Sequence, residues 1–320
     1  MNDAILGSNY IKIENSKATK KTFRQFFKQN KALYLMVLPG LIITIIFKYL
    51  PFYGILVSFE NFNPAKGVFG SEWVGFSHFL TFFKDPYFFR LFKNTFLLGF
   101  YSLIFGFPAP ILLALLFNEV KNVTFKKVTQ TISYMPYFLS IVIVIGLLKD
   151  MISMSDGVVN EIIAALGFEK INFLIDSGYF RPMYVITGIW QGVGYGSIIY
   201  LGAISNINPE LYESAVLDGA SRLKQAIYIT IPCIAPTIVV LFIFAVGGIL
   251  GNDFQKILLM YNPSVYETAD VISTYVYRQG ILGASYSYAS AVGLFNSVVS
   301  FIFLITTNRL SRKISETSLW

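Results

Sequence analysis

The stretch YESAVLDGASRLKQAIYITIP, residues 212–232, is a charged insert in the apolar second half of the chain. Its charged residues are Glu213, Asp218, Arg222 and Lys224. Long apolar runs lie close to it on both sides. The insert therefore separates two segments of membrane-like character, and its own structure depends on local helix signals.

The residues around this insert carry the start and stop signals of two short helices. Asn208 can cap the first helix, and Gly219 can end it in a left-handed conformation at little steric cost. Ser221 can cap a second helix, which we expect to end at Pro232 and Pro236. Residues 205–232 are thus predicted to form a helix–glycine–helix elbow that lies against a membrane.

The composition places the chain among membrane proteins. Of its 320 residues, 55% are hydrophobic and only 13% are charged, and the mean hydropathy is +0.60. A soluble domain carries about 25% charged residues, so one aqueous core cannot hide this much apolar surface. The single cysteine, Cys233, excludes a disulfide framework within the chain, and the single histidine, His78, excludes a histidine-based metal cluster.

Six apolar segments are long enough to cross a bilayer as helices, which takes about 20 residues each. They cover residues 32–58, 94–117, 129–148, 183–204, 234–251 and 289–307. We therefore predict an all-α integral membrane protein with six transmembrane helices. The membrane domain is expected over residues 32–310, between an N-terminal tail of residues 1–31 and a C-terminal tail of residues 311–320.

The distribution of positive charge predicts the orientation of these helices. The two tails and the loops after the second and fourth spans hold 15 Lys and Arg residues, whereas the other, longer loops hold nine. The positive-inside rule makes both termini and the elbow cytoplasmic in a multi-pass protein of the cell membrane. The net charge of +7 then needs no nucleic-acid partner to explain it.

The N-terminal tail shows no apolar signal-peptide region, so we expect no cleaved signal. Residues 19–31 place Phe23, Phe26 and Phe27 on one helical face among basic residues. This pattern predicts an interfacial helix on the cytoplasmic leaflet of the lipid bilayer. A disordered basic tail is the alternative.

The spacing of certain residues within the elbow is more specific than the start and stop signals of helices require. Glu213–Ala215 is followed after three residues by Gly219, and after nine more by Ile229–Pro232. This spacing resembles the EAA motif, EAA-x3-G-x9-I-x-L-P, of the permease subunits of binding-protein-dependent ABC importers. Ser214 replaces the first alanine after the glutamate and Ile231 replaces the leucine, and both departures are mild.

The resemblance covers nearly the whole chain. Segments similar to carbohydrate-uptake permeases are residues 47–64, 73–95, 133–140 and 190–221. DVISTYVYRQG (270–280) and YSYASAVGLFNSVVSF (286–301) resemble the oligosaccharide and polysaccharide branch of that class. The resemblance implies an oligosaccharide or related carbohydrate as cargo, with a peptide or lipid precursor as the alternative.

The resemblance also implies a mechanism and a set of partners. The fold would be that of a type I ABC importer permease, and the elbow would be the cytoplasmic coupling helix that docks on an ATPase. The coupling residues carried over are Glu213, Ser214, Ala215, Asp218, Gly219, Ala220 and Pro232. The sequence lacks the G-x-x-x-x-G-K-[ST] phosphate loop, so ATP and Mg are expected on two partner ATPase subunits. A second permease, which would form a heterodimer with this chain, and an extracellular solute-binding protein complete the expected assembly.

A translocation path for sugars needs aromatic platforms and polar side chains that face an aqueous cavity. The candidates are Trp190, Gln191, Tyr195, Asn252, Asp253, Tyr134 and Tyr137. Glycines at 188, 192, 194 and 196 would allow close approach in the fourth span. The alternative for these residues is helix packing and headgroup anchoring.

Two other classes of membrane protein are less compatible with the sequence. A proton-coupled secondary transporter usually carries acidic residues inside its spans, and the six predicted spans contain neither Asp nor Glu. A membrane enzyme needs a catalytic cluster, for which one His, one Cys and no midspan carboxylate leave little material. We therefore expect no catalytic residue and no metal site in this chain.

Overall fold

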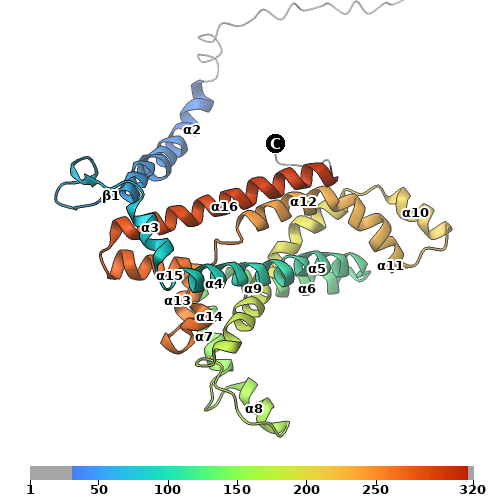
Figure 1. Ribbon diagram of the computed structural model, residues 1–320. Helices are drawn as coiled ribbons and strands as arrows, with labels where there is room; N and C mark the ends of the chain where they lie inside the picture. Colours follow the sequence, from blue (N-terminus) through green and yellow to red (C-terminus); the bar gives the residue numbers. More distant parts are fainter. Residues whose placement is uncertain (1–30, 316–320) are drawn as a thin grey trace, which may run out of the picture. The chain divides into compact units, whose positions relative to one another are not determined.

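The computed structural model describes the backbone of residues 31–315 and the side chains of residues 31–313 (Figure 1). The chain divides into two compact units, residues 1–54 and residues 55–320. The interfacial helix expected over residues 19–31 falls outside the described residues, except for Lys31.

The first predicted span is helical with a changing pitch. It consists of α2 (Lys31–Thr44), the π-helical turn η1 (Ile45–Tyr49) and the 3-10 helix η2 (Leu50–Phe59). Every side chain of α2 is exposed, including that of the internal Pro39. An apolar helix with no buried face is typical of a segment that lies in lipid.

The second unit is built mainly of helices and contains one antiparallel hairpin, β1 (Glu60–Asn61) and β2 (Glu72–Trp73). Its α-helices are α3 (Ser77–Lys84), α4 (Phe88–Tyr101), α5 (Pro108–Glu119), α6 (Val123–Tyr134), α7 (Ile141–Met151), α8 (Val158–Ala165), α9 (Ser177–Ser205), α10 (Pro209–Leu217), α11 (Arg222–Gln225), α12 (Ile231–Gly247), α13 (Phe254–Met260), α14 (Tyr266–Ala269), α15 (Ile272–Tyr277) and α16 (Tyr286–Ser315). Short 3-10 and π turns are η3 (Val68–Gly70), η4 (Ser102–Gly106), η5 (Met135–Phe138), η6 (Ala226–Thr230), η7 (Pro263–Val265) and η8 (Arg278–Leu282).

Four helical segments of the described residues are long and apolar enough to cross a membrane. They are Lys31–Phe59, Phe88–Glu119, Arg222–Gly247 and Tyr286–Lys313. They contain the first, second and sixth predicted spans and residues 234–247 of the fifth, whose helix ends four residues before the predicted boundary. The chain is therefore a mostly helical, multi-pass membrane protein.

The third predicted span, residues 129–148, is not one straight helix. Residues 123–138 and 141–151 form two helical pieces that meet at an angle of 102°. Pro136 lacks an amide hydrogen for a continuing helix, and the Ser140 hydroxyl accepts a hydrogen bond from the Ile143 amide at 3.4 Å, which caps α7. These two local signals break the helix although the surrounding residues are apolar. If the bent pair is counted as a single span, the described residues contain five candidate spans.

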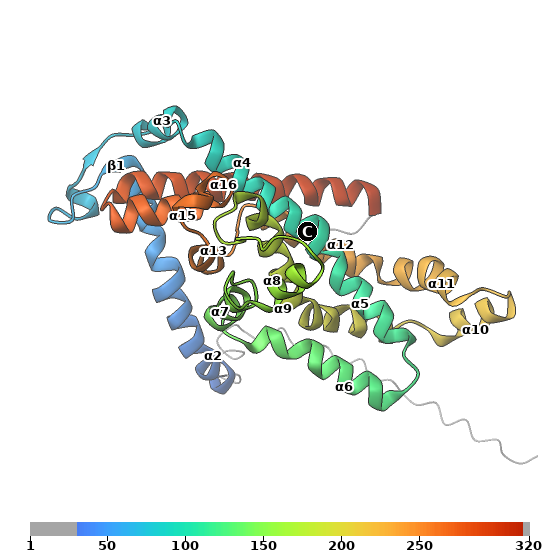
Figure 2. The same ribbon diagram turned by 90° about the horizontal axis from the view of Figure 1, so that it is seen from below.

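The fourth predicted span, residues 183–204, lies within the 29-residue helix α9. This helix is long enough to cross a bilayer, but it is not one of the four segments that are also apolar enough, because it contains several glycines and polar residues such as Gln191. It packs against α5, α6 and α12 toward one end (Figure 2) and against α13 and α14 toward the other (Figure 1). At Gly194 it approaches α6 so closely that a Cβ atom there would overlap the carbonyl oxygen of Ser133.

Two hydrophobic clusters fix α9 to its neighbours. One contains Phe180 and Tyr184 of α9 with Val144 of α7 and Ile257 of α13. The other contains Tyr200 and Ile204 of α9 with Ala114 of α5 and Ile234 of α12. Both clusters contain residues of α9, so this helix packs against α7 and α13 in one cluster and against α5 and α12 in the other.

A buried polar hub joins α4, α9 and α15. The carboxylate of Asp270, which is fully buried, accepts hydrogen bonds from both terminal nitrogens of Arg278 at 3.1 and 2.8 Å. Arg90 lies 3.5 Å from the same carboxylate. The Asn94 amide donates to the backbone oxygen of Asp270 at 3.1 Å and accepts a bond of 2.8 Å from Arg181. Two guanidinium groups thus pair with one buried carboxylate, and a third, that of Arg181, joins the hub through Asn94.

Candidate functional site

The elbow predicted at residues 205–232 begins as its sequence indicates. The Asn208 side chain accepts a hydrogen bond from the Glu210 amide at 3.1 Å, and Pro209 occupies the first position of α10. Proline fits there because the first helical amide has no partner within the helix. These local contacts fix the start of α10 without help from the rest of the fold.

The end of α10 is a left-handed glycine cap. Gly219 has φ +74°, and its amide donates to Val216 O at 3.0 Å. The Ala220 amide reaches back to Ala215 O at 2.8 Å, which completes a Schellman motif. The Ser221 hydroxyl then caps α11 by accepting a bond of 3.4 Å from the Lys224 amide. The bent helix pair expected from the sequence is confirmed.

The expected end of the second helix at Pro232 and Pro236 is wrong. The helix runs on from Arg222 to Gly247 and passes both prolines. In the π turn η6, the Ile231 amide bonds to Ala226 O, and this wider turn lets the chain continue where Pro232 offers no amide hydrogen. The second helix of the elbow and the fifth span therefore form one continuous helical segment.

Two side-chain contacts connect the elbow to the membrane helices. The Tyr212 hydroxyl lies 2.9 Å from the Thr230 hydroxyl in η6. Arg222 lies 3.9 Å from the carboxylate of Glu119 at the end of α5. The first helix of the elbow is therefore connected to η6, which leads into α12, and the second helix is connected to α5.

The surface of the elbow carries a patch of exposed side chains that combines apolar residues with charged ones. Leu217 is 89% exposed, and Val216, Leu223 and Tyr228 are also exposed. Glu213 is exposed and forms no hydrogen bond or ion pair with any residue that the structure describes. Of the other predicted coupling residues, Ser214, Ala215, Asp218, Gly219 and Ala220 lie in or just before the bend, whereas Pro232 lies in the first turn of α12. The patch has the mixed character of a protein-docking surface.

A second candidate site lies where the bend between α6 and α7 meets α9. Tyr137 of η5 stacks on Tyr195 of α9, with ring centroids 3.9 Å apart and an angle of 5° between the rings. The Gln191 amide donates to the Leu139 carbonyl oxygen at 3.2 Å, just before the bend. Two of the predicted path residues in α9 thus hold the broken segment in place.

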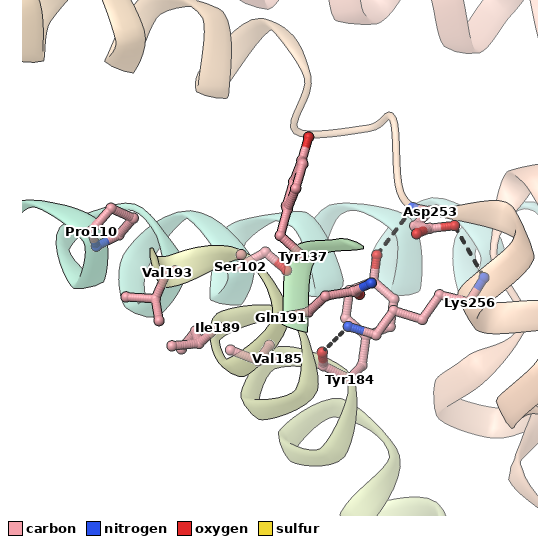
Figure 3. A pocket seen from close by; sticks show the side chains of 13 residues that line it. Ser102, Pro110, Tyr137, Tyr184, Val185, Ile189, Gln191, Val193, Asp253 and Lys256 are labelled. Atoms are coloured by element: carbon pink, nitrogen blue, oxygen red, sulfur yellow. Dashed lines mark hydrogen bonds between the residues drawn. The ribbon is translucent and has the colours of Figure 1, made fainter. Parts of the chain in front are cut away.

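A cavity of about 530 Å³ opens beside this bend (Figure 3). Its polar lining comprises Ser102, Tyr137, Tyr184, Gln191, Asp253 and Lys256. Gly188 and Gly192 also line the cavity, and because they have no side chain, their backbone forms part of the wall. Aromatic, amide, carboxylate and ammonium groups around one cavity suit a ligand rich in hydroxyl groups.

The predicted path residues divide into those at the cavity and those elsewhere. Tyr137, Gln191 and Asp253 line it. Asn252 lines an adjoining cavity of about 380 Å³ and donates to Thr95 O at 3.0 Å. Trp190 is exposed, Tyr134 ends α6, and neither lines these cavities.

Tyr184 and Lys256 belong to the site but were not among the predicted residues. Lys256 is 4% exposed, and its ammonium donates to the Tyr184 carbonyl oxygen at 2.6 Å. The ammonium also lies 4.3 Å from the centre of the Tyr184 ring. Burial lowers the pKa of Lys256 to about 8, and the charge of Asp253 opposes this shift. The one sequence signal was a lysine inside the apolar run FQKILLM (254–260).

Comparison with known proteins assigns the chain to a family. Residues 106–315 match the family "Binding-protein-dependent transport system inner membrane component", and the chain belongs to it. It is 45% identical to the polygalacturonan/rhamnogalacturonan transport system permease protein YteP of Bacillus subtilis over 292 residues, which is 91% of each chain. It is 43% identical to protein LplB of the same organism over 92% of each chain.

A solved structure shares the fold. A chain in the crystal structure of a bacterial alginate ABC transporter, in complex with an alginate pentasaccharide-bound periplasmic protein, superposes with a TM-score of 0.85. The two are 45% identical, and the match covers 93% of this chain and 99% of the other. The fold of the chain is thus that of a permease subunit of a binding-protein-dependent ABC transporter.

Proposed function

We propose that this chain is the membrane-spanning subunit of an ATP-driven importer that carries an oligosaccharide across the cell membrane. A solute-binding protein would deliver the sugar from outside, and the cavity beside Tyr137 and Gln191 would form part of its path. The cargo class rests on relatives whose names specify polygalacturonan, rhamnogalacturonan and alginate transport. The polar and aromatic lining of the cavity fits that class of ligand.

In the membrane the chain would form six spans. The bent pair α6–η5–α7 would supply the third, and α9 would supply the fourth. The lower apolarity of α9 supports this assignment, because a helix at the centre of the helical assembly and beside a cavity need not face lipid. Both termini and the elbow would be cytoplasmic, as the excess of Lys and Arg on that side favours.

The single observation that carries the coupling role is the exposed face of the elbow. Glu213 and the exposed leucines of this face are available to a partner, while the bend behind them is fixed by Gly219. The partner would be one of two ATPase subunits that hold ATP and Mg. A second, related permease would complete the translocation path. Closure of the ATPase pair would move α10 and, through the continuous helix from Arg222 to Gly247, the fifth span.

We expect Glu213→Lys to reduce sugar-stimulated ATP hydrolysis about tenfold or more, because a reversed charge at a docking surface repels the partner's basic group. The measurement uses the complete transporter in proteoliposomes, with saturating solute-binding protein and sugar. Glu169→Lys, a charge reversal in the exposed loop after α8, is the matched control and should retain wild-type activity. Equal activity of Glu213→Lys and Glu169→Lys would contradict the coupling role.

A further inference from the structure

Lys256 is a buried cation whose hydrogen-bonding capacity is only partly used. An ammonium group has three donors, and the structure gives this one a single carbonyl acceptor, Tyr184 O. No carboxylate among the described residues lies within ion-pairing distance of it. A buried ammonium without a counter-charge is costly, so its retention beside a cavity calls for a ligand that compensates it.

The fold keeps this ammonium at the cavity wall. Lys256 projects from α13 toward α9, where a Cβ atom on Gly188 would stand 3.0 Å from its Nζ atom. A larger residue at position 188 would therefore crowd the ammonium. Figure 3 shows the Lys256 side chain extending to the backbone of Tyr184, with Gln191 nearby. Packing thus holds the charge in a fixed place before any ligand enters.

The nearest acidic neighbour in the cavity wall is occupied elsewhere. The Asp253 carboxylate accepts the Lys256 backbone amide at 3.0 Å, which caps α13. The Asp253 amide in turn donates to the Tyr184 hydroxyl at 3.0 Å. Because the side chain of Asp253 serves the helix end, it does not neutralise the Lys256 ammonium by a direct ion pair.

A second cation faces the adjoining part of the path. Arg181, one turn before Tyr184 on α9, lines a neighbouring cavity of about 530 Å³ that shares Val185 and Ile189 with the first. Its Nε atom is buried without a hydrogen-bond partner, and its bonded partner, Asn94, is uncharged. The only carboxylate of the nearby polar hub among the described residues, Asp270, is bound by Arg278 and Arg90. A second positive charge without a carboxylate partner among the described residues therefore lies beside the adjoining cavity.

We propose that Lys256 binds a carboxylate of the transported sugar, so that the cargo of this chain is an acidic, uronate-bearing oligosaccharide. This inference rests on the proposed function and names the charge of its substrate. A sugar carboxylate in the cavity would accept the free donors of Lys256, while Gln191 and Tyr137 would meet hydroxyl groups and ring faces. At pH 7 the ammonium is mostly charged, because its pKa of about 8 lies above that pH.

The experiment measures uptake by proteoliposomes that contain the complete transporter and its solute-binding protein. The probes are trimers of galacturonate and of mannuronate, each paired with the same trimer after reduction of its carboxyl groups to alcohols. Wild type is expected to import an acidic trimer in preference to its reduced counterpart. Lys256→Gln should lower acidic uptake about 10- to 100-fold and leave uptake of the neutral trimer within about twofold, because only the charge-assisted bond is lost.

Two further variants separate binding from a structural role. Lys256→Arg keeps the charge and should retain most of the acidic uptake. Lys170→Gln removes a partly exposed positive charge that does not line the cavity, and it should change nothing. An equal loss for acidic and neutral trimers in Lys256→Gln, or undiminished acidic uptake, would overturn the role of Lys256. Wild-type preference for the neutral trimers would overturn it too. Failure of the wild type to import any of the trimers would instead count against the proposed function itself.

Discussion

Gly194→Ala is expected to destabilise the protein by about 3 kcal/mol, the upper range for overpacking in a close-packed interior. A single added methyl group would overlap the carbonyl oxygen of Ser133 in α6. Backbone cannot move aside as a flexible side chain can, so α6 and α9 must separate. This separation would also disturb the Tyr137–Tyr195 stack, which joins η5, directly after α6, to the residue that follows Gly194. Thermal unfolding of the detergent-purified protein measures the effect as a lowered Tm.

Gly202→Ala is the matched control for this substitution. Gly202 lies on the same helix, is exposed, and has no neighbouring atom within 4 Å of an added Cβ. Alanine in a helix interior is favoured over glycine by about 0.5–1 kcal/mol, so Gly202→Ala should raise Tm slightly or leave it unchanged. A similar Tm for both variants would show that the α6–α9 contact is looser than the structure indicates.

These two glycines show what the sequence could not distinguish. Close approach was expected at positions 188, 192, 194 and 196, and it occurs at 188, 194 and 196, where an added Cβ would meet a neighbour within 3.2 Å or less. At Gly192 nothing lies within 4 Å, and that residue lines the cavity instead. The difference depends on which helix crosses α9 at each level, which is a long-range property.

The elbow was predictable because its signals are local. Asn208, Gly219 and Ser221 act on backbone groups within a few residues of themselves, and all three do so in the structure. The apolar lengths of the first, second, fifth and sixth spans are equally local. The passage of the helix through Pro232 was missed because it depends on the π turn before it, and a helix-stop rule does not include that adjustment.

The cavity was only half predictable. Gln191, Tyr137 and Asp253 stood out as polar or aromatic residues beside apolar spans. Lys256 did not, because its burial comes from residues of α9 about 70 positions earlier in the chain, and its hydrogen bond to Tyr184 bridges that separation. The bend at Ser140 was signalled by Pro136 and a capping serine, but the apolar run around them dominated the prediction.

Asp270→Asn is expected to cost about 3 kcal/mol, the lower end of the range for breaking a buried ion pair, because Arg278 and Arg90 are partly exposed and water can solvate them in part. The substitution preserves the shape of the side chain but leaves Arg278 and Arg90 without their common counter-charge. Arg278 loses the acceptor of its two-point contact, because an amide offers one oxygen where the carboxylate offers two. The expected readout is a large drop in Tm and in the yield of monodisperse protein.

A charge pair on the surface provides the comparison. Lys170 and Glu161 lie 2.6 Å apart in the loop region around α8, where both side chains are partly exposed. Lys170→Gln should therefore cost less than about 1 kcal/mol.

The double variant Asp270→Asn with Arg278→Gln should be less destabilised than the sum of its single variants, because the second change removes one of the unpaired charges. Additive losses would mean that Asp270 and Arg278 contribute to stability separately.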